Sequence, residues 1–172
     1  RSFTIYDTAD SERVVKDVLR DRNLDEKLFA PRSVLSIISK AKDAMQTPEE
    51  FAETTGDDYR MKQIALIYAD YQSRLVASNA VDFDDIILLT VRLLREHEPV
   101  RTYYQRKFRY VLIDEYQDTN HLQYLLASLL SGGYENICVV GDDDQSIYRF
   151  RGATIRNILD FEKQYRDAKL IR

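Results

Sequence analysis

The chain has 172 residues, which is enough for one ordinary domain or for two small lobes. Its 44% hydrophobic and 31% charged residues are typical of a soluble globular protein and exclude a disordered chain. The net charge of −4 excludes a basic surface over the whole chain, so any contact with DNA has to be local.

Cysteine content and hydropathy exclude two further classes of protein. The single cysteine, Cys138, excludes an internal disulfide and a cysteine-based zinc site, and its apolar neighbours predict a small buried core residue. The lack of a disulfide framework fits a reducing compartment, so we expect a cytoplasmic protein. No run approaches the roughly 18 apolar residues that a membrane span needs. Since the chain does not begin with Met, we expect it to be part of a longer protein.

The sequence from about residue 10 to residue 107 predicts consecutive helices. Ser11 is a candidate N-cap for the first of them, and Pro31 is favoured in the first turn of the second. Thr47 and Glu50 have the spacing of a capping box, in which each side chain accepts from the other residue's backbone N–H.

Two longer helices follow in this half. Apolar residues at helical spacing predict one helix over residues 59–78. The next begins after Asp82, a candidate N-cap, and stops before Pro99. The apolar stripes favour helix-to-helix packing in a common core.

The pattern changes after residue 107. Short apolar runs at residues 110–113 and 136–140 are typical of strands, and residues 121–130 between them predict a helix. A second helix over residues 154–165 and a third strand over residues 168–171 are expected next. Alternating strands and helices favour parallel strands, so this half is predicted to be a slice of an α/β sheet of the nucleotide-binding type.

Acidic residues follow the first predicted strand at its end. In parallel sheets, ligands gather beyond the carboxyl ends of the strands. Asp114 is suited to hold hydrated Mg²⁺ against phosphates, and Glu115 is suited to take a proton from a water molecule. Strands also end in solvated acids that have no function, so this motif alone leaves both interpretations open.

The second predicted strand adds weight to the functional interpretation. Gly141 permits a close turn, and Gln145 can donate to a γ-phosphate or accept from the attacking water. In the following loop, Tyr148 and Phe150 alternate with arginines such as Arg151. These side chains could stack on bases and meet phosphates, or they could be buried in a domain interface.

Three segments resemble superfamily 1 DNA helicases of the UvrD/Rep/PcrA type. They are residues 114–120, residues 140–153 and, upstream, residues 82–85. The resemblance implies an α/β fold, with part of a RecA-like parallel sheet of the P-loop NTPase type and an all-helical subdomain. Residues 1–107 would then be the inserted 1B subdomain, with a boundary at about residues 80–108, and residues 108–172 the later part of core domain 1A.

The resemblance also implies roles for single residues, with ATP and Mg²⁺ as cofactors. Asp114 would be the magnesium ligand and Glu115 the base that activates water. Gln117 would link the nucleotide pocket to the DNA side, and Gln145 would sense the γ-phosphate. The residues implied along the single-stranded DNA are Tyr148, Phe150 and Arg151, with Phe150 standing where many relatives have Trp.

The family's phosphate-binding loop does not occur in this sequence. No Gly-x-x-x-x-Gly-Lys-Ser/Thr motif is present, and the arginines of the second motor domain are absent as well. The resemblance implies a 3′-to-5′ helicase of repair or replication as the longer protein. Because the loop is missing, we expect no ATP hydrolysis by this chain alone. Its expected partners are single-stranded DNA and junctions of single-stranded with duplex DNA.

A local basic segment and two alternative functions remain open. The resemblance implies that a local basic segment lies beside the duplex, formed by Arg101, Arg106, Lys107 and Arg109. These side chains could instead be solvated or pair with nearby acids. The longer protein could instead be the helicase subunit of a helicase–nuclease complex, or the chain could be a non-enzymatic interaction module. The two histidines, His97 and His121, do not have the spacing of a metal site.

Overall fold

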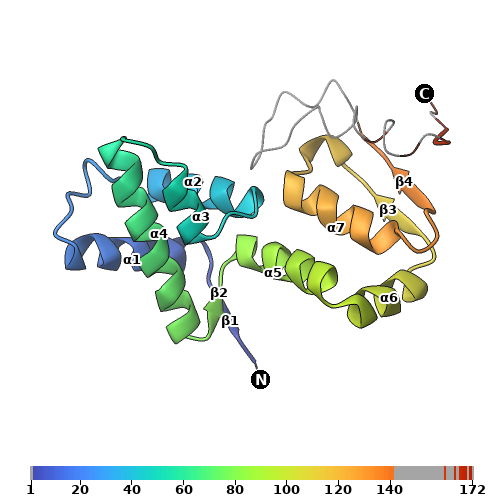
Figure 1. Cartoon of the computed structure of the whole chain (residues 1–172), viewed down its shortest axis with the longest axis horizontal. Helices are drawn as coiled ribbons and strands as arrows, with labels where there is room; N and C mark the ends of the chain where they lie inside the picture. The colour runs from blue at the N-terminus through green and yellow to red at the C-terminus, as the bar shows by residue number, and fades with distance from the viewer. Residues whose placement is uncertain (1, 142–160, 162–164, 166, 170, 172) are drawn as a thin grey trace. The chain divides into compact units, whose positions relative to one another are not determined.

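A computed structural model describes residues 2–141, 161, 165, 167–169 and 171 (Figure 1). The chain divides into two compact units, Arg1–Leu89 and Thr90–Arg172, and the division falls inside helix α5 (Phe83–Glu96). None of the helices in the described ranges combines the length and apolar composition needed to cross a bilayer.

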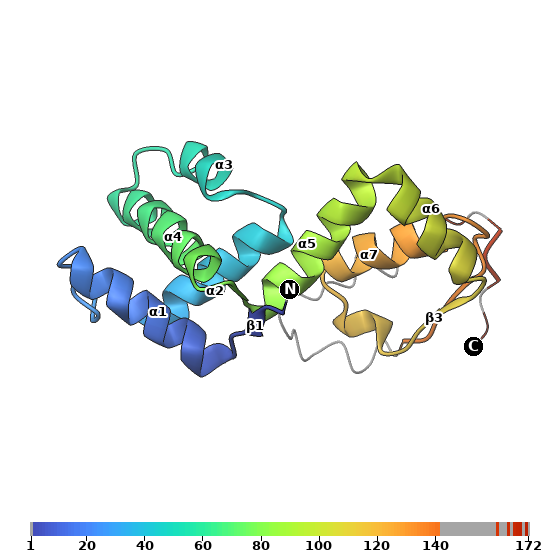
Figure 2. The ribbon, with the colours of Figure 1, turned by 90° about the horizontal axis from the view of Figure 1, so that it is seen from below.

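Residues 2–89 fold into a helical unit with a short strand pair. The strands β1 (Thr4–Ile5) and β2 (Ala80–Val81) are parallel, with Thr4 opposite Ala80. Helix α1 packs against both α2 and α4, and α3 packs on α4 (Figure 2). The helix bounds are α1 (Thr8–Asp21), α2 (Pro31–Asp43), α3 (Pro48–Glu53) and α4 (Tyr59–Ala77).

The core of this unit consists of the predicted apolar stripes. Val15 of α1, Ile38 of α2 and Ile67 of α4 have almost no solvent exposure. They belong to one cluster, whose other fully buried aliphatic members are Val18, Leu19, Val34, Ile64 and Leu75. For α1, α2 and α4 the helical periodicity therefore identified the packed faces correctly. In α5 it did not, because Phe83, Leu89 and Leu93 of the expected stripe are exposed.

The predicted helix starts at Pro31 and Thr47 are confirmed, and the one at Ser11 is wrong. Helix α2 begins at Pro31, and the backbone N–H of Glu50 donates to the Thr47 hydroxyl at 3.2 Å in a complete capping box. Helix α1, however, begins one turn before Ser11. Asp7 is its N-cap and accepts from the backbone N–H of Asp10 at 2.9 Å. A carboxylate caps a helix as well as a hydroxyl does, so Asp7 can start α1 one turn earlier than predicted. Ser11 then lies inside the helix, where it is buried.

A buried charge network ties three elements of this unit together. Lys42 of α2 is fully buried, and its Nζ lies 2.6 Å from Asp82 Oδ2 and 2.8 Å from Asp85 Oδ1. The Tyr71 hydroxyl of α4 donates to Asp82 at 2.8 Å. Burial, together with the negative charge of Asp82, raises the pKa of the Tyr71 phenol. Asp82 also accepts from the Asp85 backbone N–H at 2.8 Å, which confirms it as the predicted cap of α5.

The second unit carries two parallel strands beside helices. Strands β3 (Val111–Ile113) and β4 (Ile137–Val139) pair in parallel, with Leu112 opposite Cys138. This pairing confirms the predicted parallel arrangement. Helix α7 packs against α6 and β3 (Figure 1). The described part of this unit also contains α6 (Glu98–Lys107), the 3₁₀ turn η1 (Tyr116–Asp118) and α7 (His121–Ser131).

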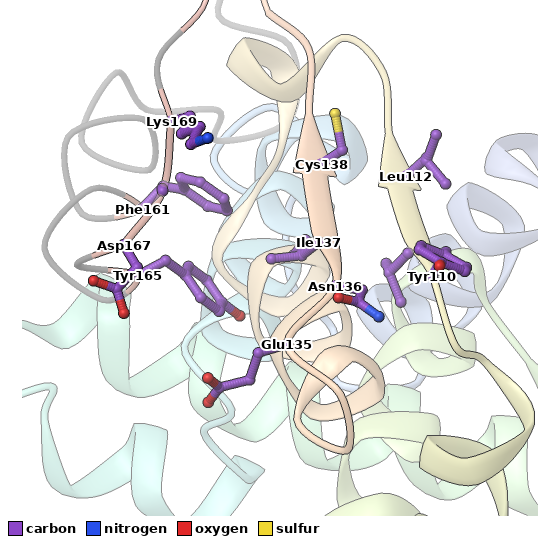
Figure 3. A pocket seen from close by; sticks show the side chains of 12 residues that line it. Tyr110, Leu112, Glu135, Asn136, Ile137, Cys138, Phe161, Tyr165, Asp167 and Lys169 are labelled. Atoms are coloured by element: carbon purple, nitrogen blue, oxygen red, sulfur yellow. The ribbon is translucent and has the colours of Figure 1, made fainter.

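The predicted burial of Cys138 is wrong. Its side chain is exposed, and Leu112 on the neighbouring strand is 76% exposed. Both side chains are among those lining a cavity of about 660 Å³ (Figure 3). Because side chains alternate across a strand, Ile137 and Val139 take the more buried side and Cys138 faces away. A continuous apolar run does not reveal which of its faces is covered.

The end of the chain differs from the sequence prediction. Ala168, Lys169 and Ile171 are not in a strand, so the predicted third strand is wrong at these positions. A strand needs a hydrogen-bonded neighbour, and in the described part of this unit the sheet consists of β3 and β4 alone. The helix expected over residues 154–165 lies largely outside the described residues, within which Tyr165 donates its N–H to the Phe161 carbonyl at 2.9 Å.

Candidate functional site

The first strand tip presents a carboxylate to solvent. Strand β3 ends at Ile113, and the exposed Asp114 follows it directly. One oxygen of Asp114 accepts the backbone N–H of Glu115 at 2.9 Å, which fixes the carboxylate at the start of the turn. Its second oxygen is a hard anionic donor of the kind that Mg²⁺ prefers.

Glu115 occupies a strained backbone conformation. Its φ of 51° and ψ of 42° lie in the left-handed region, which costs a residue with a side chain about 1–2 kcal/mol. The turn is held by the next residue, because the Tyr116 N–H donates to the Val140 carbonyl at 2.9 Å. The Tyr116 ring is buried and packs edge-on against Phe161 at 5.9 Å between centroids. These contacts of Tyr116 therefore stabilise the turn, and the turn sets the direction of the Glu115 side chain.

Gln117 holds the Glu115 carboxylate. Its side-chain Nε2 donates to Glu115 Oε2 at 2.6 Å, while Gln117 itself is 2% exposed. A buried amide has few alternative conformations, so this hydrogen bond restricts the carboxylate to one orientation. The 3₁₀ turn that contains Gln117 is closed by the Thr119 hydroxyl, which donates to the Tyr116 carbonyl.

The second strand tip touches the same turn. A Cβ atom placed on Gly141 would lie 2.9 Å from Gln117 Oε1 and 3.4 Å from Gln117 N. Only glycine leaves room for this approach. The two neighbouring strands therefore do bring their ends together, at Gln117 and Gly141.

A cavity of about 520 Å³ opens beside these residues. Asp114 and Glu115 line it together with Asp118, which the sequence interpretation did not single out. Acidic side chains within residues 114–120 were the only signal that could have pointed to Asp118. The remaining lining residues are Val111, Ile113, Thr119, Gln123, Leu126, Ala127 and Leu130.

The donor set fits a magnesium ion that is shared with phosphates. Within the described ranges, no three His, Cys, Asp or Glu side chains gather into a site that could hold a metal by themselves. Mg²⁺ commonly binds proteins through one or two carboxylates and takes its other ligands from water and substrate phosphates. Asp114 at the mouth of the cavity matches that mode.

Four of the predicted site residues fall outside the described part of the chain. They are Gln145, Tyr148, Phe150 and Arg151. The structure therefore brings together Asp114, Glu115 and Gln117 of the predicted set, and adds Gly141 as their neighbour.

The predicted basic segment contains one arginine that is bonded to the backbone and three basic side chains that are exposed. Arg101 donates from one guanidinium nitrogen to the carbonyls of Leu94 and Arg95, at 3.1 and 3.2 Å. It therefore caps the end of α5. Arg106, Lys107 and Arg109 are exposed.

Comparisons with known proteins place these features in a family. Residues 1–166 match the family model of the UvrD/REP helicase N-terminal domain. The chain is 50% identical over 171 residues to the ATP-dependent DNA helicase PcrA of Bacillus subtilis (strain 168), and the match covers 99% of the chain. It is 47% identical over 171 residues to the ATP-dependent DNA helicase PcrA of Staphylococcus aureus (strain Mu50). In each case the match spans 23% of the relative's length.

Proposed function

Because the chain belongs to the UvrD/REP helicase family, we propose that it is part of an ATP-dependent DNA helicase and supplies part of the nucleotide site. The observation that carries the proposal is the hydrogen bond from Gln117 to the Glu115 carboxylate beside a cavity. A carboxylate held in one orientation next to a magnesium-binding aspartate is the arrangement that phosphoryl transfer needs.

Each residue of the turn has a separate task in this proposal. Asp114 is the ligand for Mg²⁺, which when bound neutralises charge on the β- and γ-phosphates. Glu115 accepts a proton from the attacking water. Gln117 orients the Glu115 carboxylate and, through Gly141, connects this turn with the end of β4.

The subdomains, the direction of movement and the roles of the remaining residues are assigned by analogy with the UvrD/REP helicase family. Residues 1–107 form the helical 1B subdomain, and residues 108–172 form the later part of the RecA-like core domain 1A. The longer protein moves 3′ to 5′ on single-stranded DNA in repair or replication and engages junctions with duplex. Gln145 senses the γ-phosphate, and the residues that follow single-stranded DNA are Tyr148, Phe150 and Arg151.

DNA-stimulated ATP hydrolysis by the longer protein tests the proposal. Glu115→Gln keeps the size of the side chain and removes its basicity, so we expect hydrolysis to fall at least about 100-fold while ATP binding persists. Glu135→Gln is the matched control, because Glu135 is also exposed and has a φ of 54°. Equal hydrolysis by the Glu115→Gln variant and the unsubstituted protein would refute the assignment.

A second experiment tests how ATP hydrolysis is coupled to movement on DNA. Differential contact with DNA in two nucleotide states is what converts hydrolysis into movement. Gln145→Ala in the longer protein is expected to lower the base pairs unwound per ATP hydrolysed. An unchanged ratio, measured by parallel unwinding and phosphate-release assays, would remove Gln145 from the coupling role.

A further inference from the structure

The end of helix α6 concentrates positive charge and aromatic rings on a chain that is acidic overall. Residues 98–110 contain four basic side chains and one acidic one, whereas the net charge of the whole chain is −4. We call the exposed basic and tyrosine side chains of this segment the α6 patch, which consists of Tyr103, Arg106, Lys107, Arg109 and Tyr110. Glu98, Pro99 and Phe108 are exposed in the same segment.

Both rings of the α6 patch are open to solvent, and that of Tyr103 lies beside a cation. Tyr103 is 60% exposed and Tyr110 is 73% exposed. Lys107 Nζ lies 5.9 Å from the ring centroids of Tyr103, Tyr104 and Phe108. A groove of about 600 Å³ runs along this side of α6, lined by Glu98, Pro99, Thr102, Tyr103, Arg106 and Lys107.

Helix stability accounts for only part of the α6 patch. Cations in the last turn complement the helix dipole, and this explains the placement of Arg106 and Lys107. It does not explain two exposed tyrosines. Within the part of the chain that the structure describes, no ion pair includes Arg106, Lys107 or Arg109, so their charge is not neutralised there.

We propose that the α6 patch binds single-stranded nucleic acid as a site separate from the strand tips. Arg106, Lys107 and Arg109 contact the phosphates. Unpaired bases stack on Tyr103 and Tyr110, since an aromatic face accepts any base. An acidic peptide would use the cations but would have no need of the flat rings.

The α6 patch does not share residues with the nucleotide site. It precedes β3, whereas Asp114 follows the other end of that strand. Binding at the α6 patch therefore requires neither ATP nor Mg²⁺. The proposal extends the proposed function without depending on hydrolysis.

Fluorescence anisotropy tests the charges of the α6 patch. The probe is a fluorescein-labelled oligo-dT of about 15 nucleotides, titrated with the 172-residue chain without nucleotide or magnesium. Combining Arg106→Glu with Lys107→Glu is expected to weaken binding at least about tenfold and to flatten its salt dependence. The matched control combines Arg13→Glu with Lys16→Glu, which makes the same charge change on exposed positions of α1.

A ring-specific pair of variants tests the stacking. Tyr103→Ala is expected to weaken binding about fivefold or more, because base stacking is lost. Tyr59→Ala is the control, since Tyr59 is 68% exposed on α4. Circular dichroism confirms that each variant is folded. Photo-cross-linking of 5-iododeoxyuridine to the unsubstituted chain, and to the longer protein, is expected to label Tyr103 or Tyr110.

Three outcomes overturn the proposal. The first is an equal loss of binding in the α1 control, which would indicate that oligo-dT responds to the charge of the whole chain and not to the α6 patch. The second is cross-linking confined to positions outside the α6 patch. The third is displacement of oligo-dT by polyglutamate at equal charge concentration, which would indicate an acidic protein partner. Glu115→Gln is expected to leave oligo-dT binding unchanged, so a failure of the nucleotide-site assignment would be recognised separately.

Discussion

Gln117 donates its side-chain amide to the Glu115 carboxylate at 2.6 Å, two residues back along the chain. Gly141 at the end of the neighbouring strand leaves the space in which the Gln117 amide lies. The orientation of one carboxylate therefore depends on a residue 26 positions further along the sequence.

Gly141→Ala is expected to impair hydrolysis without preventing ATP binding. The added Cβ would lie 2.9 Å from Gln117 Oε1, so the amide has to move and the Glu115 carboxylate loses its fixed orientation. Misplacement on this scale lowers kcat by about tenfold or more, with KM for ATP nearly unchanged. Steady-state kinetics of the longer protein measure both constants.

Gly132→Ala is the control for that variant. A Cβ at Gly132 would lie 3.0 Å from Gln105 Nε2, which donates to the Leu129 carbonyl, so the clash falls on a hydrogen bond outside the turn of Glu115 and Gln117. If Gly141→Ala and Gly132→Ala had the same kcat, the proposed positioning of Glu115 through Gln117 would be contradicted.

The 172-residue chain alone is expected to show no ATP hydrolysis, with or without single-stranded DNA. It has Asp114 and Glu115 but no phosphate-binding loop, and that loop supplies much of the preorganised positive potential around the phosphates. A phosphate-release assay measures this. Turnover that disappears in the Glu115→Gln variant would prove the expectation wrong.

Lys42→Met is expected to destabilise the helical unit by about 3–5 kcal/mol. The substitution leaves Asp82 and Asp85 buried without the cation that lies within 2.8 Å of both. Urea denaturation measures the loss. Lys40→Met, at an exposed position of the same helix, is expected to change the free energy of unfolding by less than about 0.5 kcal/mol.

Adding Asp82→Asn and Asp85→Asn to Lys42→Met is expected to restore part of the lost stability, because no uncompensated charge then stays buried. If the triple variant were less stable than Lys42→Met alone, hydrogen bonding by the two carboxylates would outweigh their charge.

Cys138 is expected to react readily with a thiol reagent in the folded chain. Its side chain is exposed on β4, so the rate should be within about tenfold of that in urea-unfolded chain. Absorbance after addition of an aromatic disulfide reagent gives both rates. Protection by more than about 100-fold would mean that this side of the strand pair is covered.

Local sequence by itself determined most of the secondary structure. The capping box of Thr47, the Pro31 start of α2 and the Asp82 cap of α5 are interactions between residues at most three or four apart. Apolar spacing identified the faces that form the helical core, and two apolar runs predicted the parallel strands. The motif after β3 pointed to Asp114 and Glu115 as neighbours at one site.

Only the tertiary structure decided which side of β4 is covered, where Lys42 finds its partners and how Glu115 is held. Cys138 is exposed because burial of a strand face depends on what packs against it, and an apolar run does not contain that information. Lys42 pairs with carboxylates 40 and 43 positions away, and Gln117 needs the space at Gly141. Such contacts arise between residues distant in sequence, so local propensity cannot specify them.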